Sequence, residues 1–411
     1  MDLTERLYYT DCFLHEFDAR VLSVTRAAGG TAVMLDRSAF YPTSGGQTFD
    51  TGWLGLAADA SRLRVLEVTE DERTGDVLHV VEAAPEHLQP GSNIRGSIDR
   101  ERRLDHMQQH SGQHVLSAAF ERLYELATLS FHMGDESCTI DLAATSVSPA
   151  QLKEAERLSN EIVAEDRAVE IRFATPEEAR TMGVRKIPAA AHEKLRLIDI
   201  RDFDLNACGG THVRSTGQIG AILLRKTDKV KQGVRVEFVC GLRAMGTARR
   251  DFETLTEAAG LFSTHIREVP QQVRKSLEEI RSAQKAQHRL LEEVAELQAE
   301  RLLQSAEMRG GHRLVVQYFA DRDLGFIKML AQKLTGSGQA VALLACGGAQ
   351  PSLVFAQTPG LSQDMGALLK QAAQALGTRG GGNRDMAQGG APDGARAEAA
   401  LRQAASQIGA G

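Results

Sequence analysis

The sequence is short of cysteine, of long apolar runs and of an export signal. Its 411 residues hold five cysteines, an odd number scattered along the chain. This usage argues against a disulfide framework and favours the reducing cytoplasm. The apolar run 340–346 is far shorter than the roughly 20 residues that cross a membrane, and residues 1–6 lack the basic start of a secretory signal. We therefore expect a cytoplasmic protein of two or three domains that has no membrane partner.

One stretch, residues 102–120, has apolar side chains at helical spacing and no glycine before Gly112. We expect it to form one helix, on which residues four apart lie above one another. His106, His110 and His114 would then form a column that suits a metal ion, although surface histidines by chance are the plainer alternative. The column is about 12 Å long at 1.5 Å per residue. Only an adjacent pair can therefore bind one ion, and the spacing leaves both pairs open.

A second group of ligand-type residues lies about a hundred residues later, in Cys208-Gly209-Gly210-Thr211-His212. Two glycines allow a backbone turn tight enough for the thiol and the imidazole to reach one ion. Together with two helical imidazoles, this pair makes the four ligands that zinc prefers, and a thiolate selects zinc over magnesium or calcium. A buried, apolar cysteine is the alternative. The two motifs together predict one zinc ion per chain.

These two motifs resemble the editing domain of alanyl-tRNA synthetases, in which a His-x-x-x-His helix and a Cys-x-x-x-His loop share a zinc ion. The resemblance implies that the ligands are His110, His114, Cys208 and His212, and that His106 is only their neighbour. The helix lacks the glutamate of a His-Glu-x-x-His motif and so offers no built-in general base. A metalloprotease is therefore disfavoured.

Residues 1–95 are predicted to form a small β-barrel, because short β-branched or alternating runs are separated by Gly, Asp or Asn. Within them, Gly45 and Gly46 stand beside hydroxyls and an amide, where backbone N–H groups can approach a phosphate or carbonyl oxygen. An ordinary hairpin loop is the alternative. The stretch 40–52 resembles the glycine-rich loop of the same editing family, although Ser44 stands where that loop often has a third glycine. We expect the two glycines to bind substrate.

Residues 96–245 alternate predicted helices and strands, which is typical of an α+β sandwich. The resemblance to the alanyl-tRNA editing domain implies that serine, wrongly attached in place of alanine, is removed. Serine differs from alanine by its hydroxyl, and a buried polar partner for that hydroxyl discriminates well. Our hypothetical pocket consists of residues that follow the histidine helix, namely Thr128, Ser130 and His132. The side chains expected to act in catalysis are Gln113, beside the metal, and Gln47, in the glycine-rich loop.

A basic segment ends this region. Residues 222–250 contain eight basic and two acidic side chains, a local charge of +6 in a chain whose net charge is −6. The pattern predicts a β-hairpin. Its basic side chains could contact the phosphate backbone of tRNA, and the alternative is a charged hairpin that is only solvated. The candidate tRNA contacts are Lys226, Lys229, Lys231 and Arg235.

Residues 246–308 become helical and charged. An apolar seam through Val273, Leu277 and Ile280 continues further along and is typical of a coiled coil, while Pro270 marks a break between two helices. The seam suits a coiled-coil hairpin that joins domains, or an arm through which a homodimer forms. The sequence does not choose between them.

Residues 309–411 are predicted to form a separate α/β domain, because buried strand runs alternate with helical segments. The glycine-rich segment 377–390 carries Arg379 and Arg384 and is predicted to be a loop. It is similar to the signature loop of the C-terminal domain of alanyl-tRNA synthetase, which that family uses to hold tRNA. The resemblance implies that both arginines contact tRNA, and this domain is the second place for a homodimer contact.

The resemblance covers the whole chain and implies a freestanding alanyl-tRNA editing protein of the long type. Since residue 1 stands directly before the barrel, we expect no amino-acid-activating module and no use of ATP. By resemblance, the substrate is tRNA(Ala) carrying serine, or glycine, and the reaction is zinc-assisted ester hydrolysis in the service of translation fidelity. Two alternatives stay open, a non-catalytic tRNA-binding protein with a structural zinc and a zinc hydrolase for a small ester or amide.

Overall fold

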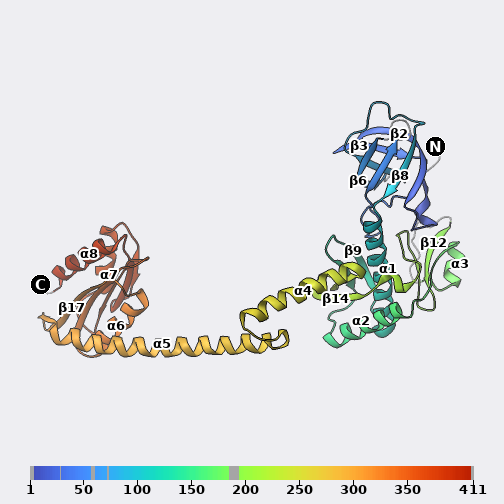
Figure 1. Cartoon of the computed structure of the whole chain (residues 1–411). Helices are drawn as coiled ribbons and strands as arrows, with labels where there is room; N and C mark the ends of the chain where they lie inside the picture. Colours follow the sequence, from blue (N-terminus) through green and yellow to red (C-terminus); the bar gives the residue numbers. More distant parts are fainter. Residues whose placement is uncertain (1–3, 28, 57–60, 72–73, 185–193, 409–411) are drawn as a thin grey trace. The chain divides into compact units, whose positions relative to one another are not determined.

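The computed structural model describes residues 4–27, 29–56, 61–71, 74–184 and 194–408 (Figure 1). The chain divides into two compact units, residues 1–257 and 258–411. The first unit contains a closed barrel and smaller sheets, and the second contains one six-stranded sheet. The predicted α+β class is confirmed, while the predicted boundaries near residues 95, 245 and 308 stay predictions.

The barrel closes in the strand order β2-β3-β7-β6-β5-β8. Its strands are β2 Glu16–Ala27, β3 Gly30–Leu35, β5 Gly52–Leu56, β6 Arg62–Glu70, β7 Val77–Val81 and β8 Asn93–Ile98. Apolar side chains on alternate positions fill its interior. Beside it lie β1 Glu5–Arg6, which pairs with β4 Arg37–Ser38, and a short 3-10 helix, Leu7–Tyr9. The predicted barrel is confirmed. The sequence pattern did not predict β5 and β8, in which glycines interrupt the alternation.

Helix α1, Arg100–Tyr124, follows β8 directly and carries the histidine column, as predicted. Near its start, the fully buried Arg103 donates hydrogen bonds to the carboxylate of Asp50, which is also fully buried. The same guanidinium donates to the carbonyls of Cys12 at 2.7 Å and Ala39 at 2.6 Å. One side chain thus ties three segments of the barrel region to the helix, and we call this set of contacts the Arg103 clamp.

Two further sheets surround α1. The four-stranded sheet has the order β14-β15-β10-β9, with β9 Thr128–Met133, β10 Cys138–Leu142, β14 Ile222–Val230 and β15 Gly233–Cys240. The three-stranded sheet has the order β11-β12-β13, with β11 Val169–Ala174, β12 Leu195–Ile200 and β13 Asp204–Ala207. Two helices with Ser or Thr capping boxes complete the core, α2 Pro149–Ala164 and α3 Pro176–Thr181, together with a 3-10 turn, Thr216–Ile219. The basic hairpin expected from the sequence is β14–β15.

Helix α4, Gly241–Leu261, follows β15, and helix α5, Val269–Ser305, begins after a short 3-10 turn, Ile266–Glu268. Pro270 lies in the first turn of α5, where its missing N–H costs nothing. The predicted break between two helices is confirmed.

The sheet of the second unit has the order β16-β17-β18-β19-β21-β20. Its strands are β16 Glu307–Arg309, β17 His312–Phe319, β18 Ala340–Cys346, β19 Ser352–Gln357, β20 Gly380–Gly382 and β21 Met386–Gly390. The end of α5 and α6, Leu324–Gly336, cover one face, while α7, Met365–Ala375, and α8, Gly394–Gln407, cover the other (Figure 1). The expectation of a plain loop at residues 377–390 is wrong, since β20 and β21 form a hairpin there.

No helix among the described residues combines the length and the apolar character that crossing a bilayer requires.

Candidate metal centre and the cavity beside it

Four side chains from two distant parts of the chain meet at one buried point. His110 and His114 come from α1, and Cys208 and His212 come from the loop that follows β13. One potential ligand atom from each residue lies within 4.8 Å of the other three. The Cys208 Sγ is 3.4 Å from the Nε2 of His110 and 3.3 Å from the Nε2 of His212. This group, the His/Cys cluster, could hold a metal ion.

The third histidine of the column does not join the cluster. His106 is buried one turn earlier on α1, and its Nε2 lies 3.3 Å from the Thr48 hydroxyl. Its Nδ1 is buried without a partner in the described part of the chain. Helical spacing left two adjacent pairs possible. The structure selects His110 and His114, because the loop of Cys208 contacts α1 beside these two residues.

The Nδ1 atom of each cluster histidine has its own polar neighbour. The Nδ1 of His110 is 2.7 Å from the Oε1 of Gln47, and that of His114 is 3.3 Å from a carboxylate oxygen of Asp204. The Nδ1 of His212 is 3.1 Å from the hydroxyl of Ser111. Such contacts fix the orientation of an imidazole and leave Nε2 as its free lone pair. All three rings are thus set to present Nε2 to the same point.

The charges in the cluster favour a thiolate. Burial by itself raises the pKa of Cys208, but the neighbouring His110 and His212 outweigh it and hold that pKa well below the usual value. Burial lowers the pKa of His114, yet its hydrogen bonds to Asp204 and Cys208 raise it to about 9. Burial lowers the pKa of His212 to about 3. An anionic sulfur beside imidazoles is a donor set that binds a divalent cation.

Glycines allow the two halves of the cluster to approach. A Cβ at Gly210 would lie 2.1 Å from Cε1 of His110, so a larger residue here would force the loop or the His110 ring to shift. In the glycine-rich loop, Gly45 and Gly46 have positive φ angles of 56° and 85°. The carbonyl of Gly46 accepts a hydrogen bond from the Met133 N–H of β9 at 2.9 Å. Of the two predicted substrate-binding glycines, Gly46 therefore packs against β9.

The two glutamines expected to act in catalysis have different surroundings. Gln47 is fully buried, and its Oε1 also accepts from the Thr211 N–H at 3.1 Å. Gln113 precedes His114 on α1 and donates to the Ser117 hydroxyl at 2.8 Å. The structure thus places Gln47 behind His110, whereas Gln113 faces the adjoining cavity.

A cavity of about 600 Å³ adjoins the cluster on the side of His114. On its wall, the hydroxyl of Thr128 donates to that of Ser117 at 2.7 Å, so that Gln113 and Thr128 share this serine. The residues that line the cavity are Gln113, His114, Ser117, Glu121, Ala127, Thr128, Leu129, Ser130, Phe131, Asn206 and Ala207.

A bulge in β9 separates the three residues of the hypothetical pocket. Thr128 pairs with Leu142 and Ser130 with Asp141, so two steps on β9 match one step on β10. Neighbouring residues of a strand face opposite sides, and Thr128 and Ser130 therefore point to opposite faces of the sheet. The Ser130 hydroxyl donates to Asp141 at 2.9 Å, and the exposed His132 is outside the residues that line the cavity.

Several residues around the cluster were not predicted. Ser117 lies three positions after His114 on α1, and Asp204 and Asn206 precede Cys208 at alternate positions. Helical and strand periodicity place such residues on the same side as the ligands. That spacing is the signal by which the sequence could have identified them.

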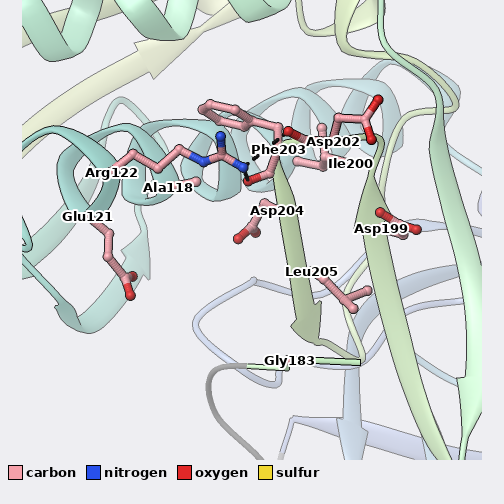
Figure 2. Close-up of a pocket in the computed structure, with 10 residues that line it drawn as sticks. All are labelled: Ala118, Glu121, Arg122, Gly183, Asp199, Ile200, Asp202, Phe203, Asp204 and Leu205. Carbon is pink, nitrogen blue, oxygen red and sulfur yellow. Dashed lines mark hydrogen bonds between the residues drawn. The ribbon is translucent and has the colours of Figure 1, made fainter. Parts of the chain in front are cut away.

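A second cavity, of about 410 Å³, is lined by residues of α1, β12 and β13 (Figure 2). Figure 2 shows Arg122 reaching the backbone of residues 202 and 203, to whose carbonyls it donates hydrogen bonds of 3.1 and 2.6 Å. Asp204 contacts this cavity as well as His114. Among the described residues that line it there is no member of the His/Cys cluster.

The basic side chains predicted to contact tRNA differ in whether they already have partners within the protein. Lys226 is paired with Asp228 and Glu237, and Arg235 makes hydrogen bonds of 2.7 and 2.9 Å to Asp141. Near the tip of the same hairpin, two further basic side chains are exposed, Lys229 and Lys231. In the second unit, Arg379 is exposed just before β20, and the exposed Arg384 donates to the carbonyls of Gln363 at 3.3 Å and Ser362 at 3.4 Å.

Comparison with known proteins places these features in context. Residues 195–236 match the family described as threonyl and alanyl tRNA synthetase second additional domain, and residues 5–102 match class II (A) tRNA synthetases. The chain is 30% identical over 393 residues to the alanyl-tRNA editing protein AlaX-L of Pyrococcus horikoshii, with 94% of each chain covered. It is 33% identical over 394 residues to the alanine–tRNA ligase of Archaeoglobus fulgidus, covering 94% of this chain and 42% of the ligase.

The chain thus spans less than half the length of the ligases that it matches. A solved structure, the C-Ala domain of the Aquifex aeolicus alanyl-tRNA synthetase, covers 26% of this chain and 98% of its own. It is 20% identical, with a TM-score of 0.24.

Proposed function

The chain belongs to the family of alanyl-tRNA editing proteins, and from this membership we propose that it is a hydrolase that deacylates mischarged tRNA(Ala). The proposed substrates are chiefly Ser-tRNA(Ala) and also Gly-tRNA(Ala). The proposed reaction is hydrolysis of the aminoacyl ester, without ATP. The name of the P. horikoshii relative and the match to a tRNA synthetase accessory domain support this assignment.

The observation that carries the proposal is the His/Cys cluster at the wall of a cavity. One thiolate and three imidazoles fit zinc, and we propose one zinc ion per chain, held by His110, His114, Cys208 and His212. Bound zinc would polarise the ester carbonyl or lower the pKa of a water molecule. The cavity volume of about 600 Å³ is in the range of small-molecule sites, so it can take the acylated end of a tRNA.

The residues around the cavity provide a way to discriminate Ser-tRNA(Ala) from Ala-tRNA(Ala). Thr128, Ser117 and Gln113 form a connected polar wall next to His114. A substrate hydroxyl could join this network, whereas the alanine methyl group could not. Since a site that is built to bond a hydroxyl rejects the analogue that lacks it, we propose Thr128 as the main specificity contact of the predicted pocket.

Matched threonine variants test this role. Thr128→Val should reduce the preference for Ser-tRNA(Ala) over Ala-tRNA(Ala), because the methyl group cannot bond to Ser117. Thr139→Val, at a position that pairs with His132 on the face of the sheet opposite Thr128, serves as the control and should keep the preference. Equal selectivity in both variants would rule out the proposed contact.

The proposed tRNA contacts are the exposed basic side chains of two hairpins. Phosphate contacts weaken with salt, because binding releases counterions. A Lys229→Gln/Lys231→Gln double variant should bind tRNA more weakly and with a shallower salt dependence than the wild type. Arg235 is already held by Asp141, so Arg235→Gln should alter tRNA binding less. Electrophoretic mobility shifts at several salt concentrations would measure both effects.

We also propose a homodimer through the exposed seam of α5. Val273, Leu277 and Ile280 are between 40% and 53% exposed and lie on one stripe of the helix. Ile280→Glu should lower the molar mass measured by light scattering if this seam joins two copies. A monomeric wild type would exclude the proposal.

The decisive experiment for the reaction uses purified protein and mischarged tRNA. Ser-tRNA(Ala) should be deacylated at neutral pH, Ala-tRNA(Ala) much more slowly, and Cys208→Ser or treatment with a chelator should abolish the reaction. Tight tRNA binding without ester hydrolysis would favour the alternative, a tRNA-binding protein with a structural zinc. Circular dichroism of the chelated protein separates loss of the metal from loss of the fold.

A further inference from the structure

The loop Cys208–His212 supplies half of the His/Cys cluster from a stretch that is neither helix nor strand. Its backbone N–H groups have separate partners. The N–H of Thr211 donates to Gln47 at 3.1 Å, that of His212 to the sulfur of Cys12 at 3.4 Å, and that of Val213 to Ser111 at 3.1 Å. Because a buried carbonyl also needs a partner, the carbonyls that this tight turn directs inward must meet a donor.

That donor is Arg196, on β12. Its Nη1 donates to the carbonyl of Cys208 at 2.7 Å and to that of Gly210 at 2.9 Å. The backbone N–H of Cys208 in turn donates to the Arg196 carbonyl at 3.1 Å, so side chain and main chain of one residue bind the loop. Arg196 is only 6% exposed.

The same guanidinium also contacts the N-terminal segment. Its Nε donates to the carbonyl of Tyr9 at 2.9 Å, its Nη2 is 3.5 Å from the sulfur of Cys12, and its Cζ lies 5.4 Å from the centre of the Tyr9 ring. Cys12 is the residue whose sulfur accepts from the His212 N–H. Arg196 therefore connects the turn between Cys208 and His212 to Cys12, whose sulfur holds the backbone of His212.

We propose that Arg196 is a positioning residue, which holds the Cys208–His212 loop in the shape that brings both ligands to His110 and His114. This inference rests on the proposed function, since it concerns the same metal. Only a planar fork with several donors can reach two carbonyls of the loop and a third carbonyl behind it. A lysine at this position would keep the positive charge, but its single ammonium group could not reach all three carbonyls.

The test is the zinc affinity of Arg196→Lys, measured on the full chain by competition with a chromophoric chelator. Loss of a residue that orients metal ligands typically costs 10- to 100-fold in affinity, and the dissociation constant for zinc should rise by roughly that factor. In the cobalt-substituted protein, the thiolate-to-cobalt absorption should shift, because Cys208 would approach the ion differently. The control is Arg172→Lys, on the adjacent strand β11, where Arg172 is paired at the surface; both readouts should match the wild type.

The outcomes separate this inference from the proposed function. A wild-type chain that takes up no zinc would refute the proposed metal site. Zinc uptake by the wild type with an unchanged affinity and cobalt spectrum in Arg196→Lys would overturn the positioning role alone. If Arg196→Lys does not fold, Arg196→Gln, which keeps one amide donor, decides by the same two readouts. Loss of the fold in both variants would assign Arg196 to the general core and would also overturn the inference.

Discussion

Replacing Gln47 by methionine tests whether this residue holds the metal site or acts on the substrate. Methionine keeps much of the volume of glutamine and removes its polar atoms. In the structure, the Oε1 of Gln47 accepts from the His110 Nδ1–H at 2.7 Å and from the Thr211 N–H at 3.1 Å, while its Nε2 donates to the Thr211 hydroxyl at 2.9 Å. All these groups are buried.

The magnitude follows from the two donors that the variant leaves unsatisfied. Each buried donor without a partner costs about 1–3 kcal/mol, so the free energy of unfolding should fall by about 2–6 kcal/mol in urea titrations. Because His110 also loses the contact that orients its ring, the affinity for zinc should fall by roughly 10- to 100-fold in chelator competition.

Gln113→Met is the matched control. Gln113 bonds to Ser117 at the cavity and does not contact a cluster histidine through any described hydrogen bond. This variant should keep the zinc affinity and slow the deacylation of Ser-tRNA(Ala). A wild-type zinc affinity in Gln47→Met would refute the reasoning, because it would show that the ring of His110 does not depend on Gln47.

Three further predictions concern stability and fit. Burial lowers the pKa of His79 from 6.5 to about 4, so between these values the unfolded chain binds the additional proton and the folded chain does not. The free energy of unfolding should therefore fall as the pH drops from 6.5 to 4, by at most about 3 kcal/mol, and urea titrations of His79→Gln should lack this part of the slope. Asp50→Asn removes the buried counter-charge of Arg103, which should cost about 3–5 kcal/mol of unfolding free energy; a loss below 1 kcal/mol would contradict the clamp. Gly210→Ala should displace the ring of His110, and a normal zinc content by atomic absorption would show that the loop can adapt.

Local patterns predicted the elements of the site. The column of histidines and the basic hairpin each depend on residues a few positions apart, where helix and strand periodicity decide the arrangement. The contacts around the cluster depend on residues far apart in the chain. Arg196 meets Tyr9, which is 187 positions away, and Gln47 meets Thr211, which is 164 positions away. Spacing alone does not predict such contacts.

Two differences have a specific physical cause. Thr128, Ser130 and His132 were predicted to line one pocket, but the bulge at Leu129 turns Thr128 to the face of the sheet opposite Ser130 and His132. At residues 377–390, glycines hide the β20–β21 hairpin, because a residue without a side chain gives no alternating pattern. In both places the register of the sheet, which the sequence does not display, decides the structure.

The Arg103 clamp limits how this architecture can be rebuilt. An engineer who wished to graft another barrel onto the same helix would have to transplant an acid equivalent to Asp50, together with two correctly placed backbone carbonyls. Without these groups, the positive charge of Arg103 would be buried without a partner between the barrel and α1. The barrel and α1 must therefore be transferred together. In exchanges of domains between related proteins, we expect the boundary to lie after α1 rather than before it.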